Sequence, residues 1–580
     1  SNNIYHITIH FSLFKLRIIY MSRQYQIFPN RNYPIVPPLN RNRQPLPGKR
    51  AGANAIDWLK SKKSADTKPK YQHLWRIKNK LYDLKEFAKF HPGGKQFIEF
   101  TQGHDCTEAY ESHHLDMKRV DNVLSNFYVQ DCTDDDLMVF ETNNNDNNNN
   151  NNNKNKNNQT PTAEETLNGG LVVDNDTALK KENGFARKKA LQIPKHLEEK
   201  MKEKKIGQQS RTFIYDPYEF YNMLKKRVLL TLLEKTKAKT TMEATAPDWK
   251  MKLINYLVIF QFFIVHSSAA MFGSYILSAL SGLALIGTWG VGHNSMHQAD
   301  KTLGWFRYGV DLTYWSSRMT RITHCLSHHQ YTNLHQDWEA TSIEHVFPFL
   351  PGGVFTDDSQ METRKGMKKF WQWNGLSAAF AFQPALTKIN LLNNAIEKNG
   401  IANVELDEWA HSLPTLQLLH YIYHQGIMKG FLLFAIQCSS FVLGFAPGAL
   451  AVHHSAKQGG QDGTEQRDTA AWHEGQAGAS TDFGRHQVMS TSDHSLHLSD
   501  GSFSGNYLSL CMYGFLNDHT AHHLFPGIDH SKHHLYRDIM QQTFKEYNVP
   551  YSTNSVIDLI SGLQTLIENK KINILQNLEL

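Results

Sequence analysis

The stretch "LINYLVIFQFFIVHSSAAMFGSYILSALSGLALIGTWGVG", residues 253–292, has no Asp, Glu, Lys or Arg in 40 residues. A helix needs about 20 mostly apolar residues to cross a bilayer. The stretch is therefore long enough for two spans, and we predict a membrane hairpin here. It decides the fold class, because only helices and closed barrels span membranes, and these segments have the length of helices.

A second apolar pair is predicted at residues 413–452, where Lys429 is the one formal charge. Its first helix is weaker than its second, so the alternative to four spans is two spans with buried core helices. The residues before the first hairpin are rich in Lys and Arg, which predicts that the N-terminal side faces the cytoplasm. After an even number of spans, the segments that begin at His293 and His453 emerge on that same side.

Histidine is frequent, with 31 in 580 residues, and three groups of it lie in these two segments. Their spacing of three or four residues puts imidazoles on one face of a helix. Eight nitrogens are too many for one ion and suit two, and an imidazole-rich open site fits iron that performs oxygen chemistry. The groups are His293 and His297; His324, His328 and His329; and His519, His522 and His523.

Other features narrow this interpretation. No carboxylate lies inside the histidine groups, unlike in soluble diiron bundles. The five cysteines are scattered and form no CxxC, which argues against a thiolate metal site and for a reducing compartment. The net charge of +6 is small for this length and predicts no nucleic-acid partner.

A second site is predicted nearer the N-terminus. His91, Pro92, Gly93 and Gly94 end a helix-like run, and His114 follows 23 residues after His91. Proline stops the helix, and the glycines let the backbone turn close beside a flat ligand. Two imidazoles from separate helices can hold a haem iron from both faces, which leaves it to carry electrons and not oxygen.

Residues 75–132 resemble the cytochrome b5 haem-binding domain, with Leu81-Tyr82-Asp83, the HPGG motif, Gly103, Asp105 and then His114. The resemblance implies haem b with His91 and His114 as axial ligands, and His113 is the alternative to His114. Pro92, Gly93 and Gly94 would line the same site.

The three histidine groups flanking membrane hairpins resemble the membrane fatty acid desaturase and hydroxylase superfamily. With the N-terminal domain the chain is similar to cytochrome b5–desaturase fusions, through "IDWLKSKK", "LWRIKNKLYDL", "RMTRITHCLSHHQYTN" and "HTAHHLFPGIDHS". The resemblance implies that the eight histidines bind two irons. It also implies one more ligand after the last span, His454 or else His453. The third group begins with His519 where many such fusions have Gln, which puts their regiospecificity in doubt here.

We therefore predict a multi-domain chain: a small α+β haem domain and an all-α membrane domain with about four transmembrane helices and a cytosolic cap of histidine boxes. The boundaries are an irregular arm at 1–69, the haem domain at 70–133, an Asn-rich disordered linker at 134–207 and the desaturase domain at 208–580. Translation is expected to start at Met21, and the linker is expected to tether the domains without fixing their geometry.

The implied function is an O2-dependent diiron fatty acyl desaturase in the endoplasmic reticulum membrane, with its haem domain and histidines facing the cytosol. Its electrons would come from cytochrome b5 reductase or a similar donor. A lipid hydroxylase or sphingoid-base desaturase is the alternative, and a haem-only electron-transfer protein with a vestigial diiron site is another. Chain length, carrier and regiospecificity do not follow from the sequence.

Three more histidines follow the last group. We expect His530 to orient a ligand through a hydrogen bond. We expect His533 and His534 to lie at the surface or the membrane interface.

Overall fold

The computed structural model describes residues 55–56, 58–59, 69–132, 213–298, 301–333, 337–339, 376–455, 481–551 and 553–568. The predicted linker at 134–207, Met21 and most of the predicted arm lie outside these residues.

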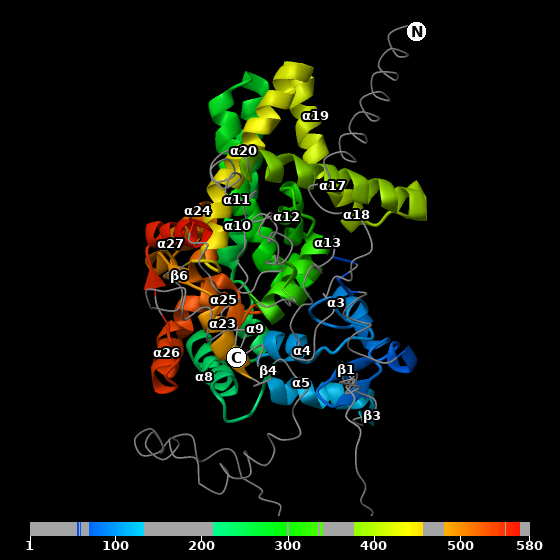
Figure 1. Ribbon diagram of the computed structural model, residues 1–580, viewed down its shortest axis with the longest axis vertical. Coiled ribbons are helices and arrows are strands. Elements are labelled where there is room, and N and C mark those ends of the chain that lie inside the picture. Colours follow the sequence, from blue (N-terminus) through cyan, green and yellow to red (C-terminus); the bar gives the residue numbers. More distant parts are fainter. Residues whose placement is uncertain are drawn as a thin grey trace, which may run out of the picture. The chain divides into compact units, whose positions relative to one another are not determined.

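The haem domain is a small α+β unit, as predicted (Figure 1). Its antiparallel sheet has the order β1-β2-β3, with Trp75 opposite Tyr82 and Leu81 opposite Gln130. Trp75, Ile77 and Tyr82 pack with Tyr110 and Leu124 in a core of their own. The elements are η1 (Pro69–Tyr71), β1 (Trp75–Ile77), β2 (Lys80–Tyr82), η2 (Phe87–Lys89), α3 (Lys95–Phe100), α4 (Thr107–His113), α5 (Met117–Leu124), η3 (Ser125–Phe127) and β3 (Tyr128–Asp131).

Three described helices are long and apolar enough to cross a membrane: α10 (Trp249–Phe272), α11 (Tyr275–His297) and α20 (Ile427–Ala451). The predicted first hairpin is α10 and α11. Asp248 caps the start of α10, whose end is Gly273 in the left-handed conformation (φ 58°), and Ser274 then caps α11. Glycine suits this turn because residues with a Cβ rarely adopt the left-handed backbone found there.

The expected fourth span is not found among the described helices. Helix α19 (Leu413–Gln425) has 13 residues, or about 20 Å, which is too short to cross a bilayer. Proline near its start and Gly426 (φ 76°) at its end set this length. Gln425 donates a hydrogen bond to the carbonyl of Ala270 (2.8 Å), so the α19–α20 turn lies beside the α10–α11 turn. Helices α11 and α20, which pack together, therefore end at the opposite, histidine-bearing side.

One residue, Gln437, pairs several polar groups inside this bundle. Gln437 of α20 accepts hydrogen bonds from Tyr421 (2.8 Å) and Ser281 (3.0 Å) and donates one to Gln417 (2.6 Å). The outer faces carry exposed Phe260, Phe272, Ile276, Tyr423 and Met428. An apolar exterior around a hydrogen-bonded polar network suits a lipid environment.

The remaining elements surround the histidine-bearing ends. Two short parallel strand pairs, β4–β5 and β6–β7, tie distant segments together. The elements are β4 (Phe213–Ile214), α8 (Phe220–Thr236), α9 (Thr241–Thr245), η5 (Lys301–Tyr308), α12 (Gly309–Leu312), α13 (Ser317–Thr320), η6 (Arg321–His328), α14 (His329–Tyr331), α17 (Leu376–Asn399), η8 (Ile401–Asn403), α18 (Leu406–Trp409), η9 (Ala410–Ser412), β5 (Thr481–Asp482), α23 (Phe483–Met489), β6 (Asp493–His494), η12 (Leu496–Leu498), α24 (Phe503–Tyr513), η13 (Leu516–Asp518), α25 (His519–Leu524), η14 (His530–Lys532), α26 (His533–Glu546), β7 (Thr553–Asn554) and α27 (Val556–Glu568).

Part of the predicted arm is ordered structure and not irregular. Residues 55–56 and 58–59 are helical, and Ala55, Trp58 and Leu59 belong to the same core cluster as Phe220 and Tyr221 of the desaturase domain. Proline- and arginine-rich flanks hid this short apolar pattern. The segment anchors the N-terminal region to the cap.

We expect Trp58→Ala to destabilise the protein, because the indole is 1% exposed. Truncating a buried aromatic side chain costs about 3–5 kcal/mol of unfolding free energy. Thermal unfolding in detergent, followed by circular dichroism, should show a lower midpoint than for Ile56→Ala, whose side chain is exposed. Equal midpoints for the two variants would mean that Trp58 does not contribute to the core.

Candidate metal and haem sites

The eight predicted histidines lie together in two adjacent buried groups, joined by a ninth. The first, the five-histidine cluster, contains His293, His297, His324, His329 and His522. The second, the four-histidine cluster, contains His328, His453, His519 and His523. In each cluster the candidate ligand atoms lie within 4.8 Å of one another.

A π-helical turn divides the second histidine group between the clusters. In an α-helix, residue i+5 lies about 140° around the axis from residue i. Segment η6 is π-helical, so residue i+5 comes about one turn after residue i. His324 therefore contacts both His328 (ring centroids 5.2 Å apart) and His329 (4.5 Å), which belong to different clusters. Helix α25 divides its histidines similarly, with His522 in one cluster and His519 and His523 in the other.

Hydrogen bonds at Nδ1 determine which ring nitrogens carry lone pairs. Nδ1 of His328 bonds to the carboxylate of Asp337 (2.9 Å), and Nδ1 of His453 bonds to the carbonyl of Ser490 (3.1 Å). Each acceptor requires a proton on Nδ1, so in the neutral rings both Nε2 atoms carry lone pairs. These Nε2 atoms face each other at 3.0 Å. Lone pairs that face each other at this distance in neutral rings repel, and a cation between them removes that repulsion.

The five-histidine cluster supports the same conclusion. His324 Nε2 lies 2.7 Å from His293 Nε2 and 3.0 Å from His329 Nε2, and His293 Nε2 is 3.1 Å from His522 Nε2. A ring nitrogen has one proton or one lone pair, so it cannot make ordinary hydrogen bonds to two others. Four converging nitrogens are instead the donor set of a metal that prefers imidazole.

Burial keeps most of these rings neutral. It lowers the pKa of His329, His519, His522 and His523 well below the usual value, and the neighbouring histidines lower it further. Neutral imidazole is the form that binds a metal. Burial also lowers the pKa of His328, but the charge of Asp337 outweighs it and leaves that pKa raised.

The ninth histidine is His453, which follows the end of α20. Its Nε2 is 2.7 Å from His519 Nε2. His454, the residue predicted first, is buried but belongs to neither cluster among the described residues. The sequence analysis missed the carboxylates of Asp337 and Glu339, which bond Nδ1 of His328 and His324. Asp337 lies 9 residues beyond His328 and Glu339 lies 15 residues beyond His324 in sequence, and such outer carboxylates orient ligating histidines in many metal sites.

The last three histidines differ from one another. His530 stacks on His522 (ring centroids 4.7 Å apart), and its Nδ1 bonds Asn294, the neighbour of His293. The prediction that His533 lies at the surface is wrong, because its side chain is fully buried and lies 3.6 Å from Asp518. Helix α26 begins at His533 and turns that side chain inward, whereas His534 is half-buried.

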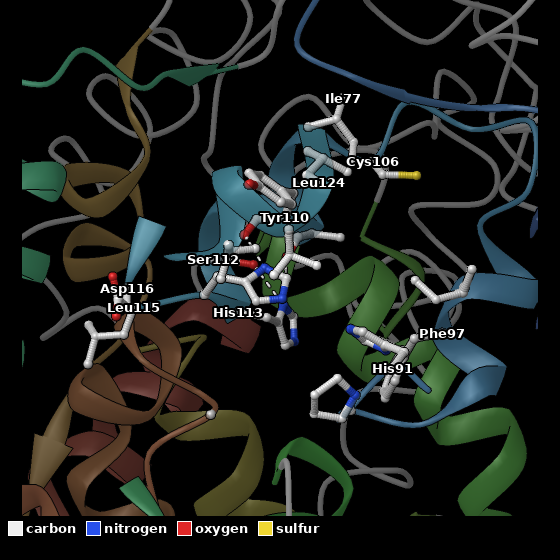
Figure 2. A pocket seen from close by; sticks show the side chains of 18 of the residues that line it. Ile77, His91, Phe97, Cys106, Tyr110, Ser112, His113, Leu115, Asp116 and Leu124 are labelled. Atoms are coloured by element: carbon white, nitrogen blue, oxygen red, sulfur yellow. Dashed lines mark hydrogen bonds between the residues drawn. The ribbon is translucent and has the colours of Figure 1, made fainter. Parts of the chain in front are cut away.

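The haem domain contains a cavity of about 440 Å³ lined mostly by apolar side chains, with His91, Tyr110 and His113 among them (Figure 2). The rings of His91 and His114 face each other across it, with centroids 6.3 Å apart. That separation leaves room for one metal atom, since a metal–imidazole bond is about 2 Å long.

Both rings are oriented by their own backbone. Nδ1 of His91 bonds the carbonyl of Gly94 (3.1 Å), and Nδ1 of His114 bonds that of Tyr110 (2.8 Å), which places the proton on Nδ1 and the lone pair on Nε2 of each neutral ring. Burial lowers the pKa of His114 to about 4, so its ring is neutral at pH 7. A Cβ on Gly93 would lie 3.0 Å from the His91 ring, which explains the small residue there.

His113 faces elsewhere. Its ring stacks on His297 of the five-histidine cluster, with centroids 6.0 Å apart and planes at 21°, and it also contacts Phe97. Its Nδ1 bonds Ser112 Oγ (2.9 Å) and the carbonyl of Ala109 (3.2 Å). The ring that lies opposite His91 is therefore that of His114.

Sites of this kind, buried imidazole clusters at the ends of apolar helices beside a haem-type cavity, define a membrane oxidoreductase with a haem-binding domain. Comparison with known proteins identifies the two domains more specifically. Residues 59–133 match the family described as "Cytochrome b5-like Heme/Steroid binding domain", and residues 267–555 match "Fatty acid desaturase". The chain is thus a cytochrome b5–fatty acid desaturase fusion.

Individual relatives agree with this assignment. A "Cytochrome b5-related protein" of Drosophila melanogaster is 24% identical over 499 residues, which cover 84% of this chain and 86% of that protein. A protein of the same description from Drosophila virilis is 57% identical over 42 residues, 7% of this chain and 30% of its own length. An "Acyl-lipid omega-13 desaturase" of Chlamydomonas reinhardtii is 40% identical over 55 residues, 10% of this chain and 12% of its length. No solved structure matches the chain at a significant level.

The neighbouring histidines at the end of α20 allow a matched test. We expect His453→Ala to lower the iron content of the purified protein, because its Nε2 lies between those of His328 and His519. His454→Ala should keep the iron content of the unchanged protein. Elemental analysis of both variants decides the matter: iron loss confined to His454→Ala would reverse the assignment.

Proposed function

We propose that the protein is a membrane-bound, O2-dependent diiron fatty acyl desaturase that receives electrons through its own haem domain. The observation that carries this is the convergence of nine buried histidines in two adjacent clusters, with outer carboxylates that hold Nε2 lone pairs toward each centre. A vestigial site would have lost some of these residues or their partners. The desaturase domain and the algal desaturase relative support a lipid substrate.

The proposal assigns iron-binding roles to the nine histidines and positioning roles to two carboxylates. His293, His297, His324, His329 and His522 would hold one iron, and His328, His453, His519 and His523 would hold the other. When bound, the diiron centre supplies the activation of O2 and the removal of hydrogen from an unactivated C–H bond. Asp337 and Glu339 fix the rings of His328 and His324, and burial of all nine side chains excludes bulk water. His519, at the position where many fusions have Gln, contributes a ligand of its own.

In the haem domain, His91 and His114 would be the axial ligands of haem b. With both axial positions closed, the haem supplies one-electron transfer and does not bind O2. We place the protein in the endoplasmic reticulum membrane, with the histidine-bearing ends of α11 and α20 toward the cytosol. The basic residues before α10 support this orientation, and a cytosolic reductase of the cytochrome b5 reductase type is the expected electron donor.

Lipid profiling tests the reaction. Cells that express the protein should accumulate acyl chains with new double bonds, and His522→Ala should abolish them because it removes a ligand from the five-histidine cluster. His534→Ala, outside both clusters, should leave the new products in place. New hydroxylated lipids in place of double bonds would instead identify a hydroxylase, and no new product would contradict an enzymatic role.

Absorbance spectroscopy tests the haem ligands. We expect His91→Ala and His114→Ala to lose the bis-histidine haem spectrum while they keep their iron clusters. His113→Ala should retain that spectrum, because its ring is turned toward His297. A normal spectrum in His114→Ala together with loss in His113→Ala would assign the axial ligand to His113.

A further inference from the structure

The haem cavity is not closed by the haem domain alone. Its wall also contains Met242, Thr245, Phe525 and Ile528 of the desaturase domain, together with His297. The cavity and the five-histidine cluster therefore share one side chain, His297. The two redox sites are separated by a single layer of residues.

His113 lies in that layer. It is the last residue of α4, directly before His114, the proposed axial ligand, and its ring is stacked on that of His297, with planes at 21°. Its Nε2 is buried and has no hydrogen-bond partner among the described residues. From His114 to the cluster, the path runs along one peptide bond, through the His113 side chain and across one ring-to-ring contact. Electronic coupling falls less along covalent bonds and close contacts than across open space.

The end of α4 that carries His113 is pinned to the desaturase domain. Glu111 forms an ion pair with Lys225 of α8 (2.7 Å), and neither side chain is more than 3% exposed. Lys225 also donates to the Glu111 carbonyl (3.1 Å), and Tyr221 donates to the carbonyl of Ser112 (3.5 Å). Glu111 also pairs with Lys78 of the haem domain (2.9 Å), so Lys225 is the cation that joins α4 to the desaturase domain.

A second set of contacts holds the other side of the cavity. Gln96 of α3 donates to the carboxylate of Asp407 (2.6 Å) and accepts from Arg321. Arg321 is the first residue of η6, the segment that carries His324 and His328 and leads directly into His329. These contacts join α3 of the haem domain to residues of the desaturase domain.

We propose that His113 is a positioning residue that carries the electronic coupling between the haem and the five-histidine cluster, and that the Glu111–Lys225 pair holds it there. The inference rests on the proposed function. In the step, one electron leaves the ferrous haem, which becomes ferric, and one ferric iron of the cluster becomes ferrous. His113 forms and breaks no bond, and no proton is transferred.

The test follows the haem and not the product. The purified full chain is loaded with haem and iron, and the haem is reduced by a light flash with a deazaflavin under anaerobic conditions. Haem absorbance then reports reoxidation as the electron moves to the iron. We expect His113→Leu to slow this phase by an order of magnitude, while the haem spectrum, midpoint potential and iron content stay unchanged. His73→Leu, an exposed position of the same domain, is the matched control.

A second variant pair tests the docking. Lys225→Met should slow reoxidation with an unchanged haem spectrum, and Lys226→Met, the exposed neighbour, should not. His113→Phe, which keeps a ring for stacking, should recover part of the rate lost in His113→Leu.

Three outcomes overturn the inference, and they are distinguishable. Equal rates for His113→Leu and His73→Leu would show that the electron takes another path while the proposed function stands. Loss of the haem spectrum in His113→Leu would make His113 a haem ligand. An unchanged protein that reoxidises no faster than its iron-free form would contradict electron delivery and the proposed function with it.

Discussion

Nine buried imidazoles with converging ring nitrogens are the constraint on which the rest of the structure depends. Burying one histidine costs little if both nitrogens find partners, but here Nε2 of His453 lies 3.0 Å from that of His328 and 2.7 Å from that of His519. One ring nitrogen cannot make ordinary hydrogen bonds to two others. The cap therefore has to hold these side chains against each other, and a metal bound there as proposed would add its binding free energy to that of folding.

The surrounding elements can be understood as the means of holding that arrangement. Helices α11 and α20 end beside each other because their turns lie together at the far end, through the bond between Gln425 and Ala270. Because η6 is π-helical, His324 and the residue directly after the segment, His329, lie in one cluster, whereas His328 lies in the other. π-Helical turns are rare in proteins, and they are frequently found at functional sites. Asp337 and Glu339 then fix the rings from outside.

Local spacing made much of this predictable. The helical spacing of the three histidine groups identified all eight of their histidines as candidate ligands. The HPGG motif, together with the separate His114, identified the haem cavity. Three of the four expected spans are present, but a hydropathy pattern did not reveal that Pro414 and Gly426 shorten α19. The choice between His453 and His454 depends on where α20 ends, and the exposure of His533 depends on where α26 begins. In both cases a shift of one residue in the helix end would change the outcome. A sequence pattern does not locate helix ends to within one residue. The buried Glu111–Lys225 pair joins residues 114 positions apart, which no local pattern contains.

The shared wall of the haem cavity has a consequence for the proposed electron transfer. A freely diffusing carrier meets its acceptor by collision, so its delivery rate falls on dilution and it can serve many acceptors. Here Met242, Phe525 and Ile528 of the desaturase domain complete the cavity of the haem domain. A carrier built this way would be committed to one acceptor with fixed one-to-one stoichiometry, and its delivery would be first order and independent of protein concentration. Only the proposed electron donor would then have to arrive by collision.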